Sequence, residues 1–156
     1  MKVNLMWGQG HPLSGYLNVD PHTFGVEGVN TGDVTDLDGY VNDSEATEIL
    51  ALDIIDFLPL DIAGKAIHNW VQKLRHGGRI VVGGTDVALV CMMFNKKEMD
   101  LTEFNKIMHG EQTAGWDFKA SHLSIKELAE LLEGLVLKIL KKRHSKFKMS
   151  VEAQRP

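Results

Sequence analysis

The sequence is poor in cysteine, in proline and in long apolar runs. It has one cysteine and four prolines among 156 residues. A single cysteine, Cys91, excludes an internal disulfide and a zinc site made of cysteines alone. Its apolar neighbours Val90 and Met92 predict that it is buried. No apolar run approaches the ~20 residues of a membrane span, and the N-terminus shows no signal-peptide pattern. We therefore expect a cytoplasmic protein without a membrane segment.

Positive charge is also in the minority. Lys and Arg number 17 against 21 Asp and Glu, which gives a net charge of −4 and argues against binding to nucleic acid. The basic stretch 138–148 predicts a solvated hairpin, with a patch for an acidic partner as the alternative. The hydrophobic fraction of 44% is that of a globular protein, and the length fits one domain spanning residues 1–156.

Short apolar segments predict a largely parallel sheet. Residues 2–6, 16–19, 48–52 and 79–82 predict strands whose sequences lack clean alternation, as is typical of strands covered on both faces. Apolar residues at helical spacing predict a helix over 62–74, stopped by Gly77 and Gly78.

The second half of the chain predicts two more helices and a hairpin. Asp100 with Glu103, and Ser124 with Glu127, have the spacing of capping boxes before amphipathic segments. Residues 136–140 and 146–151 predict two antiparallel strands around a turn at 141–145. The fold class is therefore α/β, with a mixed sheet that is mostly parallel, a C-terminal antiparallel hairpin and helices on both faces.

A glycine loop follows the first strand. Gly8 and Gly10 let the backbone approach a ligand closely, although a tight surface turn is the alternative. Asp20 ends the second strand, where a carboxylate can accept bonds from two ribose hydroxyls. Only five residues separate Gly10 from Tyr16, so no crossover helix can support a pyrophosphate. A nucleoside without phosphate, such as S-adenosylmethionine, therefore fits better than NAD.

Aspartates come after several predicted strands. Each one can instead cap a helix or face water, but together they would repel a pyrophosphate and attract a sulfonium cation. These residues are Asp20, Asp33, Asp36, Asp53, Asp56 and Asp86.

Seven loose motifs in the same order resemble a known family. The chain resembles the small class I S-adenosylmethionine-dependent methyltransferases, whose fold is a Rossmann-like mixed sheet. The family patterns L-N-L-G-C-G, P-L-P-G-Y and N-V-D correspond to residues 4–8, 12–16 and 18–20. Further matches are Asp36-Leu37, residues 47–57, 75–80 with Thr85-Asp86, 116–121 and 150–153.

The resemblance implies a role for each matched residue. Gly8 and Gly10 would approach the methionine part of S-adenosylmethionine, and Asp20 would hold its ribose. The adenine would contact Asp36 and Leu37. Leu52 would line the cofactor site, and Asp53 would be the catalytic base or orient the substrate, with the capping of a turn as its alternative.

Departures from the family pattern leave a second reading open. Met6 stands in place of the first glycine of G-C-G, so Gly8-Gln9-Gly10 would make the turn instead. Asp53, Phe57 and Lys119 stand in place of family histidines. The first hypothesis is a methyltransferase acting on a small molecule, sugar or glycan component. The second is a degenerate, non-catalytic binding or scaffold protein.

Other features complete these expectations. Trp116 and His122 are further candidates for the site, with a packing residue and a surface histidine as the alternatives. The histidines show no metal-ligand spacing, so we expect no metal. A nucleic-acid methyltransferase and a nicotinamide dehydrogenase rank lower. The apolar stretch 87–94 leaves room for a homo-oligomer interface.

Overall fold

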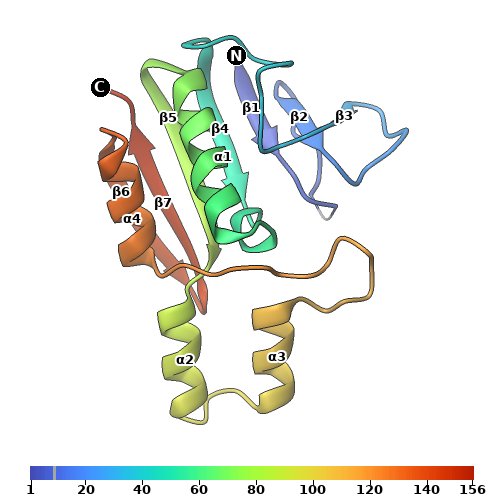
Figure 1. Cartoon of the computed structure of the whole chain (residues 1–156), viewed down its shortest axis with the longest axis vertical. Helices are drawn as coiled ribbons and strands as arrows, with labels where there is room; N and C mark the ends of the chain where they lie inside the picture. The colour runs from blue at the N-terminus through green and yellow to red at the C-terminus, as the bar shows by residue number, and fades with distance from the viewer. Residues whose placement is uncertain (9) are drawn as a thin grey trace.

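A mixed seven-stranded sheet forms the centre of residues 1–8 and 10–156, which the computed structural model describes. Strands β1 to β5 are parallel, and β7 lies antiparallel between β5 and β6 (Figure 1). The order across the sheet is β3-β2-β1-β4-β5-β7-β6. The strands are β1 (Lys2–Leu5), β2 (Leu17–Asp20), β3 (Val29–Thr31), β4 (Ala46–Leu52), β5 (Leu74–Thr85), β6 (Lys138–Ser145) and β7 (Lys148–Gln154).

The helices take two different positions relative to this sheet. Helices α1 (Leu60–Lys73) and α4 (Ile125–Gly134) lie against it, whereas α2 (Val87–Asn95) and α3 (Leu101–His109) project beyond the carboxyl ends of the strands (Figure 1). A short 3₁₀ turn, η1 (Ile55–Phe57), follows β4. The expected mixed sheet with its antiparallel C-terminal hairpin is confirmed.

Both covering helices lie on one face of the sheet. Along β7, Met149, Val151 and Ala153 are buried in the same core as α1 and α4, while the alternating residues are half-exposed. In the described part of the chain no helix packs on the other face, so the expectation of helices on both faces is wrong. The β1–β2 and β2–β3 connections that cross this face are too short to hold a packed helix. We call this side the open face.

Two asparagines anchor the short β1–β2 connection. On the open face, the amide of Asn4 donates to Asn18 Oδ1 at 2.9 Å. The same oxygen accepts the Leu13 N–H at 2.9 Å, and Asn18 Nδ2 donates to the Leu13 and Gly28 carbonyls at 3.0 and 3.1 Å. A buried side-chain amide thus satisfies backbone groups that a helix would have satisfied internally.

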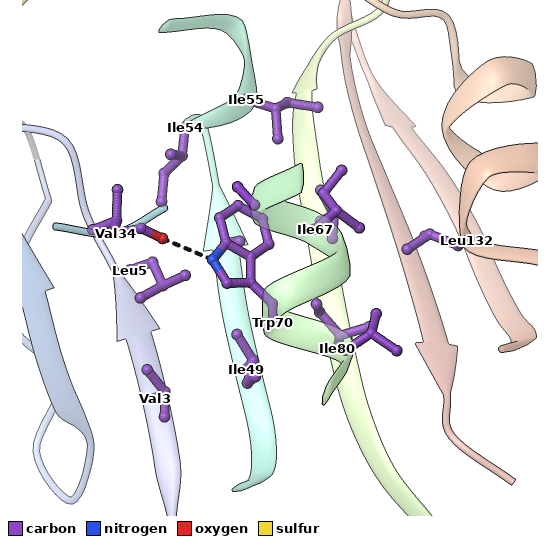
Figure 2. Packing of buried hydrophobic residues seen from close by; sticks show 14 of the residues in the cluster. Val3, Leu5, Val34, Ile49, Ile54, Ile55, Ile67, Trp70, Ile80 and Leu132 are labelled. Carbon is purple, nitrogen blue, oxygen red and sulfur yellow. Dashed lines mark hydrogen bonds between the residues drawn. The ribbon is translucent and has the colours of Figure 1, made fainter. Parts of the chain in front are cut away.

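Trp70 stands at the centre of the core. It is fully buried on α1 among apolar residues of the central strands, and its indole donates to the Val34 carbonyl at 2.7 Å (Figure 2). Ile67 and Trp70 share one face of α1, because residues three apart are neighbours on a helix. This packing joins α1 and the segment after β3 to the sheet.

Several predicted boundaries shift in the structure. Helix α1 ends at Lys73 and β5 starts at Leu74, so Gly77 and Gly78 lie within a strand and do not stop the helix. The hairpin turn falls at Lys146 and Phe147, and the predicted turn 141–145 is part of β6. Strand β3 and helix α2 were not predicted, whereas both capped helices were: Asp100 accepts from Glu103 N and Ser124 from Glu127 N.

Helices α2 and α3 form a small hairpin with its own apolar cluster. Val90, Met99 and Ile107 are its buried members. Cys91 is exposed, which corrects the expectation that it is buried, because on α2 only Val90 is fully turned into this cluster. Among the described helices, none has the length and apolar character needed to cross a membrane.

Candidate functional site

Asp20 holds the glycine loop against the end of β2. Its buried carboxylate accepts the Gly8 N–H at 2.9 and 3.1 Å, the His22 N–H at 2.8 Å and the Thr23 hydroxyl at 2.7 Å. Gly8 has a φ of +75°, a conformation that favours glycine. Asp20, which the sequence predicts to bind a ribose, therefore fixes the glycine loop in this structure. Both of its carboxylate oxygens accept hydrogen bonds from protein donors.

Side chains of the protein itself lie close to both glycines. A Cβ at Gly8 would lie 2.5 Å from Trp116 Cε2, and one at Gly10 would lie 2.6 Å from Met6 Sδ. Met6 is buried and its N–H donates to the Val19 carbonyl at 2.9 Å, so it prolongs β1 where the family pattern has a glycine. Gln9, predicted as part of the turn, lies outside the described residues.

Aromatic side chains cover the carboxyl ends of β1 and β4. Trp7 stacks on Phe57 with ring centroids 5.9 Å apart, and Phe57 contacts Trp116 edge-on at 6.2 Å. The Trp7 indole donates to the Trp116 carbonyl at 3.0 Å and packs edge-on against His22 at 4.5 Å. Trp116, a candidate from the sequence, thus lies over the glycine loop, and Phe57 has a packing role where the family has histidine.

A crevice opens beside this cluster on the open face. Its volume is ≈ 260 Å³. It brings together three predicted site residues, Gly10, Leu52 and Asp53, while Gly8 and Asp20 are not among its walls. We call it the edge crevice, and it is lined by Asn4, Leu5, Met6, Trp7, Gly10, His11, Leu13, Leu50, Leu52 and Asp53.

Asp53 occupies a sharp turn directly after β4. Its φ of +58° is unusual for a residue other than glycine, although aspartate tolerates it better than most. The turn is held by the bond from the Asp53 N–H to the Gly83 carbonyl, 3.1 Å long. The carboxylate is 45% exposed and pairs with Lys148 Nζ at 3.1 Å. This backbone presents a charged side chain at the end of β4.

Asp53 also lines two neighbouring cavities. The first, ≈ 290 Å³ in volume, we call the face cavity; it is bounded by Leu52, Asp53, Gly83, Gly84, Arg143, His144, Ser145, Lys148, Met149 and Ser150. The second, ≈ 370 Å³, lies toward α3 and includes Trp116 and Lys119. Of the predicted site residues, Asp53 alone lines all three spaces in the described structure.

The other aspartates do not all meet at this edge. Asp36 is exposed and accepts from the side chain of Asn69 on α1 at 3.4 Å; Leu37 is buried in the core, with its N–H bonded to Asn69 Oδ1 at 2.9 Å. The structure therefore does not bring the predicted adenine residues to the edge crevice. Asp86 caps α2. Among the described residues, no three His, Cys, Asp or Glu side chains are grouped as a metal site would require.

Asp56 ties the segment that carries Trp116 to the sheet. Its buried carboxylate accepts the Thr85 N–H at 3.0 Å and lies 3.7 Å from Lys119 Nζ and 3.9 Å from His122 Nδ1. Its backbone carbonyl accepts the Ala120 N–H at 2.7 Å. His122, a candidate base from the sequence, lies here and does not line the edge crevice.

Sequence reasoning missed two cations near Asp53. Arg143 and Lys148 line the face cavity although they follow Asp53 by some ninety residues in the chain. Their signal is the basic run 138–148, which predicts a solvated hairpin or, as the alternative, a patch for an acidic partner. The antiparallel pairing of β7 with β5 brings Lys148 to the end of β4, and the pairing of β6 with β7 adds Arg143.

Comparison with solved structures places this geometry in a known fold. A S-adenosylmethionine-dependent methyltransferase from Archaeoglobus fulgidus matches with a TM-score of 0.63 and 13% identity, over 99% of this chain and 86% of that one. A possible histamine N-methyltransferase from Thermotoga maritima gives 0.60 and 18%, over 90% and 72%. The 1,6-didemethyltoxoflavin-N1-methyltransferase of Burkholderia thailandensis gives 0.60 and 15%, over 98% and 70%.

These likenesses establish the fold and not more, since identity is low throughout. The chain has the fold of the class I methyltransferases. It spans just under two thirds of the length of a methyltransferase from Methanosarcina mazei, and half or less of several other matches. No protein-family model and no curated protein matches the sequence.

Proposed function

We propose that the protein is an S-adenosylmethionine-dependent methyltransferase acting on a small molecule. One observation carries the proposal: Asp53 lies at the junction of the edge crevice and the face cavity. A cofactor in the first space and an acceptor in the second would meet at this carboxylate. The methyltransferase fold, whose ligands bind at the carboxyl ends of the strands, supports this arrangement.

The residues of the edge crevice fit the cationic end of the cofactor. When bound, S-adenosylmethionine supplies an electrophilic methyl group on a positively charged sulfur. Trp7 and Leu52 offer an aromatic and an aliphatic wall, Gly10 a close backbone approach, and Asp53 a negative charge. For the adenosine end, Asp20 would exchange the Thr23 hydroxyl for a ribose hydroxyl, the same kind of donor.

The protein's own groups would orient the reactants and move a proton. Asp53 Oδ2 can accept the proton of an attacking hydroxyl or amine, and Lys148 at 3.1 Å holds that carboxylate in place. The stacked Trp7 and Phe57 exclude water from the side of the glycine loop. Orientation in the crevice would supply most of the rate enhancement, since the cofactor already carries the activated group.

Calorimetric titration with S-adenosylmethionine tests the proposal. We expect binding by the wild-type protein, and about tenfold weaker binding by Asp53→Asn, because a carboxylate beside the sulfonium is lost. Asp61→Asn, the same chemical change at an exposed position of α1, is the matched control and should bind normally. No binding at millimolar cofactor rejects the function. An equal loss of affinity in both variants rejects the placement of the sulfonium end of the cofactor in the edge crevice.

The burial of Asp20 favours a second candidate, a non-catalytic protein that has kept the fold. Both carboxylate oxygens already have protein donors, and Trp116 lies over Gly8. In that case the aromatic cluster of Trp7, Phe57 and Trp116 would stay packed over the glycine loop and block the place where the adenosine would bind. Transfer of a labelled methyl group from S-adenosylmethionine to any small acceptor excludes this candidate. If Asp20→Ala binds adenosine as tightly as the wild-type protein does, Asp20 does not hold the ribose, and this result would support the second candidate.

A further inference from the structure

The face cavity is a hollow in the sheet that small residues create. Gly83 and Gly84 of β5 form part of its floor, with the Leu52 side chain and the Met149 backbone beside them. A Cβ at Gly83 would lie 2.9 Å from Leu52 Cδ2 and 2.7 Å from the Met149 carbonyl oxygen. The hollow therefore depends on glycine, and on the open face of the described structure no helix covers it.

Its floor and its rim differ in character. The floor consists of the exposed side chain of Leu52, the backbone of Gly83, Gly84 and Met149, and the small side chain of Ser150. It offers mainly apolar contact, with the Ser150 hydroxyl as its hydrogen-bonding side chain. A neutral sugar, which needs a partner for each buried hydroxyl, matches such a floor poorly. A flat apolar group matches it well.

The rim is cationic. Arg143 and Lys148 contribute two positive charges, against the single carboxylate of Asp53. Both cationic side chains are about half exposed. Arg143 forms a long ion pair of 3.9 Å with Glu152, a carboxylate that is also paired with Arg79 at 3.3 Å, so the cations exceed the carboxylates at this rim. The surrounding stretch 138–148 holds six of the 17 lysines and arginines and no acidic residue. An anionic group would gain here, and a cationic group would be repelled.

We propose that the face cavity binds the methyl acceptor and that this acceptor is an organic acid with a flat apolar body. The apolar body rests on Leu52 and the glycine floor, and the acid group meets Arg143 at the rim. The position to be methylated then faces Asp53, which the cavity shares with the edge crevice. This inference rests on the proposed function and narrows its acceptor to one chemical class.

Calorimetric titration with naphthalene-2-carboxylate, and with its neutral analogue naphthalene-2-carboxamide, tests the inference. We expect the wild-type protein to bind the acid at least tenfold more tightly than the amide. Arg143→Gln should weaken binding of the acid about fivefold or more and leave the amide unchanged. Ser150→Leu, which fills the cavity, should abolish binding of both.

The matched control is Lys142→Gln. Lys142 precedes Arg143 on β6 and pairs with Val151, whose side chain is buried on the helix-covered face, so its own side chain points away from the open face. The variant carries the same charge change and should bind the acid as the wild type does. Equal weakening by both variants means diffuse surface attraction and overturns the inference, as does equal affinity for acid and amide.

Cofactor binding, measured on the same samples, separates the two proposals. Binding of S-adenosylmethionine without any preference for the acid leaves the function standing and overturns the acceptor class. Selective binding of the acid, sensitive to Arg143 but not to Lys142, together with no binding of S-adenosylmethionine, supports the anion-binding cavity and rejects the methyltransferase.

Discussion

Trp70 stabilises the fold through both its volume and its one polar atom. Replacing it by phenylalanine leaves the buried Val34 carbonyl without a donor, at a cost of about 1–3 kcal/mol. The smaller ring also leaves a void in the core. We expect Trp70→Phe to lower the free energy of unfolding by at least about 2 kcal/mol in urea titrations.

The matched variant is Trp7→Phe. The Trp7 indole also donates to a carbonyl, that of Trp116 at 3.0 Å, but this site is partly exposed and water can replace the donor. Its cost should stay below about 1 kcal/mol. An equal or larger loss in Trp7→Phe would mean that the aromatic cluster, and not the core under α1, limits stability.

Lys73 gives the fold a specific pH dependence. Burial acts to lower the pKa of its ammonium group, but hydrogen bonds and charges from Asp38 and Asp43, each 2.6 Å away, outweigh it and raise that pKa above 10.5. The hydrogen bond from Lys73, with a second from Asn69, lowers the pKa of Asp38 below 3.8. The ion pairs of Lys73 therefore contribute their full stabilisation of the fold between the ordinary pKa values of Asp38 and Lys73, 3.8 and 10.5. This stabilisation is lost as pH falls through the lowered pKa or rises through the raised one.

Lys73→Met should remove this dependence. We expect the urea midpoint of the wild type to exceed that of the variant across neutral pH, and the difference to shrink below about pH 4 and above about pH 10.5. Lys65→Met, at an exposed position of the same helix, should keep the wild-type profile. A constant difference between wild type and Lys73→Met from pH 3 to pH 11 contradicts the pairing.

The sequence patterns predicted where the site residues lie in the fold, but they did not predict which groups those residues contact. Asp20 ends β2 and Asp53 follows β4, as the apolar runs before them indicate, and both lie at the carboxyl edge. The Asp20 carboxylate accepts hydrogen bonds from Gly8, His22 and Thr23. These contacts depend on the conformation of the loop, which no local sequence pattern encodes. Asp36 was placed by motif order alone, and its neighbour Asn69 comes from a helix thirty-three residues away.

At the scale of elements, the α2–α3 hairpin should open independently of the sheet. Asp100 caps α3 by accepting the Glu103 N–H at 2.8 Å, a contact worth about 1 kcal/mol. Because the hairpin packs mainly on its own small cluster, Asp100→Ala should speed hydrogen exchange about fivefold in α3 and leave the central strands unchanged.

The corresponding cap of α4 provides the comparison. Ser124 accepts the Glu127 N–H, and α4 buries Leu128 and Leu132 in the main core. Ser124→Ala should therefore lower global stability, measured by exchange in β4 and β5. The same regional pattern of exchange in both variants contradicts an independent hairpin.

Periodicity identified the elements whose sequence signals are local. The capped helices and the apolar strands belong to this group. Strand β3 has three residues, with little apolar character, and pairing with β2 alone defines it. Helix α2 is apolar on nearly all sides, so it has no amphipathic period to detect. Gly77 suggested a helix stop, but its N–H bonds to the Arg155 carbonyl, a contact set by the end of the chain.

At the scale of the whole molecule, one core joins most of the strands to both covering helices. Residues from β1, β2, β4, β5 and β7 share it with α1 and α4. We expect one calorimetric transition with an unfolding enthalpy of about 110 kcal/mol near 60 °C. Tryptophan fluorescence and far-ultraviolet dichroism should give the same midpoint. Two separated transitions would contradict the single domain predicted for residues 1–156.

The two margins of the sheet are unequal. At one end β3 is only three residues long. At the other, β6 spans eight residues that are almost entirely exposed, with Lys138, Lys141, Lys142 and Arg143 along it. A bare strand of that length is a template on which another copy could pair, and rows of lysine keep such copies apart through mutual repulsion. Acetylation of these lysines, or coating by a polyanion, would thus remove the barrier to fibre growth along this margin.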